Sequence, residues 1–565
     1  IHNIDRNTKF TEEERADYKA QARFVRAYYY WLLLRKYGPI PIMPDEGMDF
    51  TQEYEDLAVA RSSYDEVANF IASEMQIAAK DLPLERGPLA IARPTRGAAL
   101  AARAKVLLYA ASPINNPHPS DTEKFSDMVN FDGKHLIAQE YDETKWARAA
   151  AAALDVMELP GNQANGRRYD LYHLGRRTSG SVGYPVTIEP YKDGDFSEHT
   201  WPDGWQDIDP FESYRSLFDG EVSASDNYEL IFTRGQNQSS EGVDIMVVHQ
   251  LPTSATGWNT HGLTQKMCDA YYMNDGSDCP GKDLEIGGAN GTVRETGFVD
   301  ETNQENYPEL GEHRIGVSLQ YVQREPRFYA SVAYNGSTWF LLNESNDANR
   351  NQQVFYYRGM GNGYNNNNAF WLRTGIGVKK FVHPYDTHEN RDMGRIRRKA
   401  EPAIRYAEIL LIYAEALNEL DGSHNIESWD GSKTYTIKRD INEMKKGIRP
   451  IRCRAGIPDY TAAEYASKDL FREKIKRERM IELMGEGHRY YDLRRWKDAE
   501  KEESQPIYGC NTLMTEQYKD LFHIPVVVPS LPTNFSRKMY FWPISHSELK
   551  RNRLLTQNPG WTYND

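Results

Sequence analysis

The sequence predicts a mostly α-helical protein in which helix pairs at both ends of the chain support a loop-rich middle. Near both ends, apolar residues recur at spacings of three and four. This periodicity is weak from 161 to 400, where Gly, Asn, Asp, Tyr and Trp are frequent. We expect a single unit of 565 residues, with a helical part at 1–160, a loop-rich part at 161–400 and a second helical part at 401–565.

Four helices are predicted in the first part. The first has an apolar stripe with spacings of four and three, made of Ala20, Phe24, Ala27, Trp31 and Leu34. It should end at Gly38, which Pro39 follows. The second begins at Ser63, and Glu66 three residues later completes a capping box. The third covers about 95–111 and is rich in alanine, which lets helices approach closely, and the fourth covers about 144–158.

Loops with scattered short strands are predicted for 161–400, because turn dipeptides such as Asp219-Gly220 and Asn335-Gly336 are frequent there. The Asn-rich tract 362–368 is expected to be an ordered loop, since aromatic residues flank or interrupt it. Two further helices are predicted, an amphipathic one at 404–417 and another at 463–485. Helix pairs of this kind are compatible with degenerate tetratricopeptide-like units.

The charge of the chain argues against a nucleic-acid partner. The net charge is −14, and the densest basic run, Arg472 to Arg495, is interleaved with acidic residues. That alternation is typical of an internal lattice of ion pairs. Tyrosine is abundant, at 36 residues against 20 Phe and 11 Trp, which suits a hydrated binding surface. The longest apolar stretch, Tyr28 to Leu34, is far shorter than the roughly 20 residues that cross a bilayer.

Cofactor sites are weakly indicated. The four cysteines lack the spacing of a zinc site, and Cys268 and Cys279 are expected either to form a loop disulfide or to remain thiols. No cofactor is expected, except for a possible structural Ca²⁺, since Ca²⁺ takes six to eight oxygen ligands. Its candidate ligands are acidic loop residues: Asp193, Asp195, Asp203, Asp207 and Asp209.

The most structured segment is 471–496, FREKIKRERMIELMGEGHRYYDLRRW. Spacings of four, three and four place Glu478 and Glu482 on the same helical stripe as Phe471 and Ile475. The two carboxylates are either a catalytic pair, as in glycosidases, or part of a buried ion-pair lattice. The lattice is the favoured interpretation, with arginines of the same segment as the expected partners: Arg479, Arg489 and Arg494.

This segment resembles the signature of the SusD/RagB family, E-R-x-x-E-L-x-x-E-G-x-R-x-x-D-L-x-R-W, from Glu478 to Trp496. Further segments are similar to the same family in the same order, so that the resemblance runs nearly end to end. They are 22–31 with 37–41, 102–105 with 111–113, 324–329, 405–408 with 413–417, and 542–544 with 557–561.

The resemblance implies a helical fold with tetratricopeptide-like pairs and a binding role without catalysis. It implies capture of oligosaccharides or peptides and their delivery to a SusC-like TonB-dependent barrel in the outer membrane. It also implies a lipid anchor on the extracellular face. The chain begins without Met or a lipidated Cys, so the anchor is expected upstream of these residues.

Candidate ligand-binding residues are aromatic and polar side chains on loops, because sugar C–H faces stack on aromatic rings while hydroxyls bond to polar groups. Three loops supply the aromatic candidates: Trp201 and Trp205, Trp258, and Tyr364 and Trp371. Packing within the loop or contact with the barrel is the alternative role for Trp201 and Trp205, whereas Trp258 lies in a small-residue loop where a bulky ring is hard to bury. Asp45 and Asn115 are added because they lie next to helix ends, although capping and turn formation is the favoured role there.

Three other functions stay open at the level of the sequence. Aromatic loops and paired carboxylates are compatible with a surface glycoside hydrolase, although no nucleophile motif is present. An oligopeptide-binding member of the same family is the second alternative. A purely structural scaffold or adhesin is the third.

Overall fold

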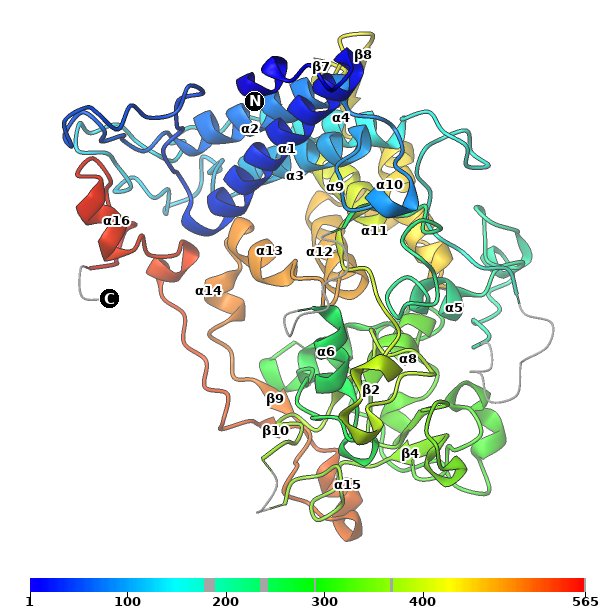
Figure 1. Cartoon of the computed structure of the whole chain (residues 1–565). Helices are drawn as coiled ribbons and strands as arrows, with labels where there is room; N and C mark the ends of the chain where they lie inside the picture. The colour runs from blue at the N-terminus through cyan, green and yellow to red at the C-terminus, as the bar shows by residue number, and fades with distance from the viewer. Residues whose placement is uncertain (177–187, 234–241, 289–290, 366–368, 563–565) are drawn as a thin grey trace.

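The protein is described here by a computed structural model that covers residues 1–176, 188–233, 242–288, 291–365 and 369–562. The mostly α-helical, loop-rich fold is confirmed (Figure 1). The long helices are α1 (Glu12–Tyr37), α2 (Tyr64–Asp81), α3 (Arg96–Ala111), α4 (Thr144–Met157), α9 (Tyr406–Asn418), α10 (Ile441–Arg454) and α12 (Lys468–Glu482).

The long helices form one continuous scaffold. Helices α1 to α4 pack in sequence order, and α4 then packs on α9, which also contacts α10 and α12. Figure 1 shows these helices gathered in the upper half of the molecule, with the blue N-terminal helices beside the yellow and orange C-terminal ones. Both ends of the chain therefore contribute to the same helical stack, as expected.

Helix α9 lies at the centre of this stack. All of its residues are buried, including the carboxylates of Glu408 and Glu415. The amphipathic helix predicted at 404–417 therefore has no solvent-facing side, and its carboxylates are neutralised inside the protein. Glu408 pairs with Lys105 of α3 at 2.9 Å, and Glu415 accepts hydrogen bonds from Arg495 and from the Trp496 indole.

The predicted helix ends agree with the structure in the N-terminal part. Ser63 and Glu66 form the expected capping box of α2, and α1 ends at Gly38 with φ at 70°, a conformation that favours glycine. The helix predicted at 463–485 is divided into α11 (Ala462–Ala466) and α12, because Ser467 has extended backbone angles and caps α12. Helix α10 has no predicted counterpart, since Pro450 interrupts its pattern.

The lower half of the molecule consists of loops, short helices and small antiparallel strand pairs (Figure 1). The remaining helices are α5 (Pro210–Arg215), α6 (Val243–Gln250), α7 (Gln265–Ala270), α8 (Pro326–Ser331), α13 (Arg489–Arg495), α14 (Ala499–Glu502), α15 (Lys519–Phe522) and α16 (His546–Arg551). The strand pairs are β1 (Leu230–Thr233) with β6 (Pro402–Arg405), β2 (Val332–Ala333) with β5 (Gly377–Val378), β3 (Ser337–Trp339) with β4 (Gln352–Val354), and β9 (Tyr508–Gly509) with β10 (Val526–Val527). A further pair, β7 (Ser423–Glu427) with β8 (Thr434–Lys438), lies in the upper half, where it packs on α4 (Figure 1).

Among the described residues, none of the helices combines the length and the apolar character that crossing a bilayer requires.

The close approach of α9 and α10 generates a prediction. A methyl group added at Gly447 of α10 would lie 2.4 Å from the carbonyl oxygen of Leu410 and 2.9 Å from the Cβ of Ala414, both on α9. Gly447→Ala should therefore lower the free energy of unfolding by about 1–2 kcal/mol, because overpacking outweighs the helix propensity gained. Urea denaturation followed by circular dichroism measures this loss. Lys446→Ala is the control, because Lys446 is the exposed residue next to Gly447. Equal stability of the two variants would contradict the close packing of α9 and α10.

Candidate functional site

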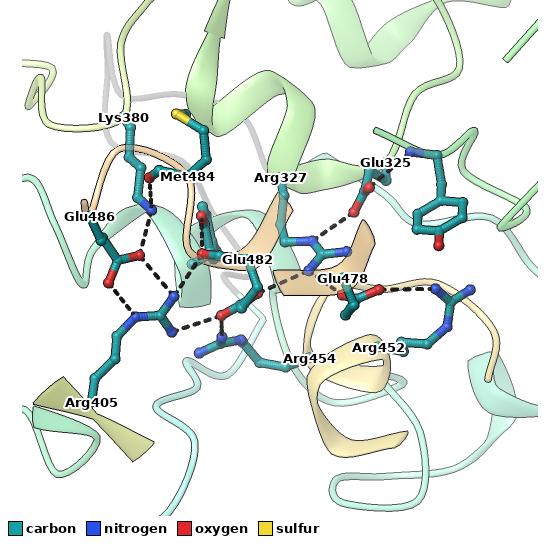
Figure 2. Close-up of polar contacts among 12 residues, drawn as sticks. Glu325, Arg327, Lys380, Arg405, Arg452, Arg454, Glu478, Glu482, Met484 and Glu486 are labelled. Carbon is teal, nitrogen blue, oxygen red and sulfur yellow. Dashed lines mark hydrogen bonds and ion pairs between the residues drawn. The ribbon is translucent and has the colours of Figure 1, made fainter. Parts of the chain in front are cut away.

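The carboxylates of Glu478 and Glu482 lie inside the protein, where both residues are 0% exposed. Arg327 of α8 donates hydrogen bonds to both carboxylates, at 2.6 Å to Glu478 and 2.9 Å to Glu482 (Figure 2). Arg405 at the end of β6 and Arg454 at the end of α10 also donate to Glu482, with Arg405 at 2.8 Å. Glu482 thus joins three segments that are far apart in the sequence.

These contacts belong to a larger set that we call the buried lattice. Five cations face five carboxylates in it, so the net charge of the set is zero. The cations are Arg327, Lys380, Arg405, Arg452 and Arg454, and the carboxylates are Glu229, Glu325, Glu478, Glu482 and Glu486. Charges can be held in the interior at this density only because each has an opposite partner and hydrogen bonds.

The arginines keep the two carboxylates ionised. Burial alone would raise the pKa of Glu482, but the nearby guanidinium groups of Arg454, Arg405 and Arg327 hold it well below its usual range. Burial would likewise raise the pKa of Glu478, and Arg327 with Arg452 lowers it. Both side chains therefore remain negative at neutral pH.

The predicted lattice is confirmed, but its predicted partners are wrong. Arg479 pairs with Asp492 at 2.9 Å, Arg489 with Glu502 at 3.2 Å, and Arg494 with Glu503 at 2.8 Å. Neighbouring residues on a helix point in directions about 100° apart, so the arginine next to Glu478 faces another part of the core. The partners of Glu478 and Glu482 instead come from α8, β6 and α10.

Two of the three predicted aromatic loops meet in the structure. Trp258 stacks on Phe370, with ring centroids 6.1 Å apart and an angle of 14° between the ring planes. Trp371, the next residue in the sequence after Phe370, has its ring centroid 4.7 Å from that of Tyr364. The loops are joined by a hydrogen bond of 2.8 Å from the Asn259 side chain to the Asn362 carbonyl. We call these four rings, Trp258, Tyr364, Phe370 and Trp371, the aromatic surface.

Polar and cationic groups border the aromatic surface. Phe370 is 46% exposed and the other three rings are half-buried. The Arg373 guanidinium lies over the Trp371 ring, 4.3 Å from its centroid. His249 meets Trp258 edge-on at 4.4 Å, and burial lowers the pKa of His249, so this imidazole is uncharged at neutral pH. The arrangement offers ring faces together with hydrogen-bond donors.

The third aromatic loop lies apart and is partly internal. Trp205 is 1% exposed and stacks on Phe196 with centroids 5.9 Å apart. Trp201 is half-buried against His173, and its backbone N–H donates to Asp207 at 2.8 Å. The Trp205 ring thus has the packing role that was its alternative, whereas Trp201 keeps part of its surface exposed.

The two candidates at helix ends have structural contacts. Asp45 is exposed and forms an ion pair with Arg26 of α1. Asn115 is 2% exposed, and its side-chain amide donates to the Tyr109 carbonyl at 2.9 Å. The Asn115 contact, at the end of α3, agrees with the helix-end role, whereas the Asp45 ion pair reaches the middle of α1 and is not a helix cap. A ligand contact for either residue stays a prediction from the sequence.

The cysteines and the acidic loop residues make contacts within the protein. Cys268 and Cys279 are buried thiols, and the Cys279 thiol donates to the Asp269 carbonyl at 3.5 Å. In the described part of the chain, no group of three or more His, Cys, Asp and Glu residues is arranged to hold a metal ion. Asp193 accepts backbone N–H groups and Asp209 caps α5, so the calcium site stays a prediction.

Three side chains at the aromatic surface were not among the predicted residues: Phe370, Arg373 and His249. Phe370 and Arg373 lie within two residues of Trp371, so adjacency to a predicted ring was an available signal. Nothing in the sequence indicated His249, because only the fold brings α6 against the loop that carries Trp258. The predicted ordered loop at 362–368 is described through residue 365, and 366–368 lie outside the described residues.

The protein thus combines a helical stack with irregular loops, which an internal ion lattice fastens to the stack and which carry partly exposed aromatic rings. Comparison with known proteins identifies the family. The protein-family model described as "SusD family" matches residues 214–561. A second family model, described as "Starch-binding associating with outer membrane", matches residues 1–108. Because the first match covers more than half of the chain, the protein belongs to the SusD family, as the signature at 478–496 indicated.

Relatives and solved structures agree with this assignment. A SusD-like protein P2 from Formosa agariphila is 31% identical over 163 residues, which is 28% of this chain and 25% of that protein, so the match spans a quarter of the relative's length. The solved structure of BT4246 has a TM-score of 0.71 at 24% identity, covering 98% of this chain and 87% of that one. A SusD-like carbohydrate binding protein from Bacteroides fragilis has a TM-score of 0.60 at 20% identity, covering 97% and 81%.

The first prediction from the lattice concerns Glu482. Glu482→Gln should lower the free energy of unfolding by about 3–5 kcal/mol, because three buried arginines lose a shared negative charge. Glu473→Gln on the same helix is the matched control, since Glu473 is exposed and pairs with Lys476 on the helix surface. It should change stability by about 0.5 kcal/mol or less. Urea denaturation measures the free energy of unfolding of both variants. Equal losses of stability in the two would refute a special role for Glu482.

The buried lattice should also make the free energy of unfolding depend on pH in the acidic range. Glutamates whose pKa is depressed in the folded state contribute stability that is fully present above the unfolded pKa, about 4.3. That contribution is lost as the pH falls through the folded pKa. Unfolding free energies measured between pH 7 and pH 3.5 should thus decline mainly below about pH 4.5. Glu482→Gln should show a shallower decline, and parallel curves would contradict the assignment of this slope to Glu482.

Proposed function

We propose that the protein is a cell-surface nutrient-binding protein that captures oligosaccharides on the aromatic surface. The observation that carries the proposal is the meeting of Trp258, Phe370, Tyr364 and Trp371 from two loops distant in sequence. Half-buried rings present flat apolar faces at fixed positions, as sugar C–H faces require. Arg373 beside Trp371 supplies donors for hydroxyl groups.

Glycan is favoured over peptide as the ligand by two of the comparisons. The family model over residues 1–108 is described as starch-binding, and one structural neighbour is described as a carbohydrate binding protein. An oligopeptide remains the competing ligand in the experiment below.

Binding without catalysis is favoured by the state of the paired carboxylates. Glu478 and Glu482 are fully buried, and arginines hold both of them ionised. A glycosidase needs one of its two carboxyl groups protonated and both in contact with the substrate. The lattice gives these residues a structural role instead.

The proposed location is the extracellular face of the outer membrane, with a lipid anchor upstream of these residues and a SusC-like TonB-dependent barrel as the partner. This part of the proposal rests on membership of the SusD family and on the description of the matched model as associating with the outer membrane. Delivery to a transporter requires release, which a broad surface of moderate affinity permits.

Calorimetry with a panel of malto-oligosaccharides, laminari-oligosaccharides and oligopeptides tests this function. Trp258→Ala and Trp371→Ala should each weaken glycan binding about tenfold, because a lost stacking contact of this kind is worth about 0.5–1.5 kcal/mol beyond its buried area. Trp542→Ala is the matched control: Trp542 is 39% exposed and contacts Tyr37 of the helical scaffold. Trp201→Ala tests the separate loop in the same assay.

Three results would contradict the proposal. They are equal weakening by Trp542→Ala, binding of peptides alone, and shortening of the glycans during incubation. The last would favour the hydrolase alternative.

A further inference from the structure

A cavity of about 480 Å³ lies between the helical scaffold and the loop-rich half, at α7, α13, α14 and β9. Figure 1 shows α13, α14 and β9 following one another along one side of the molecule. The walls of the cavity are largely apolar, from Met267, Ile286, Met480, Leu493, Ile507 and Pro532. Its size is that of a site for a small molecule. None of its lining residues belongs to the aromatic surface.

One part of the cavity wall has an excess of positive charge. Lys266 and Arg489 both pair with the carboxylate of Glu502, so two cations share one anion. Arg489 reaches it through one nitrogen at 3.2 Å, whereas a guanidinium group can hold a carboxylate through two parallel hydrogen bonds. The side chains of Lys266 and Arg489 are 29% and 33% exposed, so this part opens to solvent.

Another part of the cavity wall has an excess of negative charge. Asp269 and Glu285 both line the cavity and share Arg294, each at 2.6 Å. Arg294 and Arg324, which also interacts with Asp269, are not lining residues, so the charge that faces the cavity here is negative. Asp269 is buried, while the Glu285 side chain is 16% exposed and is the more accessible of the two. The other acidic lining residues, Asp283 and Glu503, are paired one to one with Lys282 and Arg494.

The two regions are about one helical turn apart. Lys266 and Asp269 lie three residues apart on α7, and side chains at this spacing are neighbours, with Cβ atoms about 5–6 Å apart. A complementary ligand therefore carries a negative and a positive group a short distance apart, together with an apolar body. Sugars lack this combination, whereas the termini of a short peptide have it.

We propose that this cavity is a second binding site, which takes a short zwitterionic peptide with apolar side chains. The terminal carboxylate lies against Lys266 and Arg489, and the ammonium group lies against Glu285. An apolar side chain packs on Met267 and Ile507. The site is independent of the aromatic surface, so it does not rest on glycan binding.

Calorimetry of the whole chain with the dipeptide Leu-Phe tests the site. The unmodified dipeptide should bind, and its amide and its N-acetyl derivative should each bind at least tenfold more weakly, since each lacks one charge. Arg489→Gln and Glu285→Gln should each weaken binding at least tenfold, and Arg489→Lys should restore part of the affinity. Trp258→Ala is the matched control and should leave dipeptide binding unchanged.

Absence of binding by the unmodified chain, or equal affinity for the dipeptide and its amide, would overturn the proposal. Because the ligand derivatives are tested on the unmodified chain, this result does not depend on whether a variant folds. Loss of dipeptide binding in Trp258→Ala would also refute a separate site. Glycan binding measured on the same protein reports on the proposed function separately.

Discussion

The structure depends on the neutralisation of buried charge around Glu482. Removing carboxylates and guanidinium groups from water is costly, and the cost is offset only when every charge meets an opposite one with good geometry. The buried lattice meets this condition with five cations and five carboxylates. A shift of any contributing segment would leave charges unpaired in the core. The lattice therefore sets the position of the loop-rich half on the helical scaffold (Figure 2).

A chain of contacts links this lattice to the aromatic surface. Arg327 lies on α8, which leads directly into β2, and β2 pairs with β5. Gly377 of β5 also bridges to Gly262, four residues after Trp258, while Trp371 lies a few residues before β5. The rings thus lie on loops whose bases are attached, through β5 and β2, to the segment that carries Arg327 of the buried lattice. Irregular backbone can hold side chains in fixed places when its ends are anchored in this way.

Charge balance also distinguishes the structural part of the protein from its proposed second site. In the buried lattice the positive and negative charges are equal in number and paired with one another, so no net charge remains for a ligand to neutralise. At the cavity beside α7, Lys266 with Arg489 and Asp269 with Glu285 leave opposite excesses unresolved next to apolar walls. Such an arrangement is stable without a ligand because Lys266, Arg489 and Glu285 are partly exposed to water, while the buried Asp269 is paired with Arg294. It can also be completed by a molecule of matching charges.

The sequence by itself determined the features that depend on local periodicity and short motifs. These include helices α1 to α4, the capping box of α2, the glycine end of α1, the inward stripe of Glu478 and Glu482, and the family signature. Side-chain direction along a helix follows from its 3.6-residue repeat, so burial of that stripe was predictable. Only the tertiary structure decided that Arg327, Arg405 and Arg454 neutralise Glu482, that Trp205 and Asn115 are buried, and that Trp258 meets Phe370. These outcomes depend on which distant segments pack together, and no local pattern carries that information.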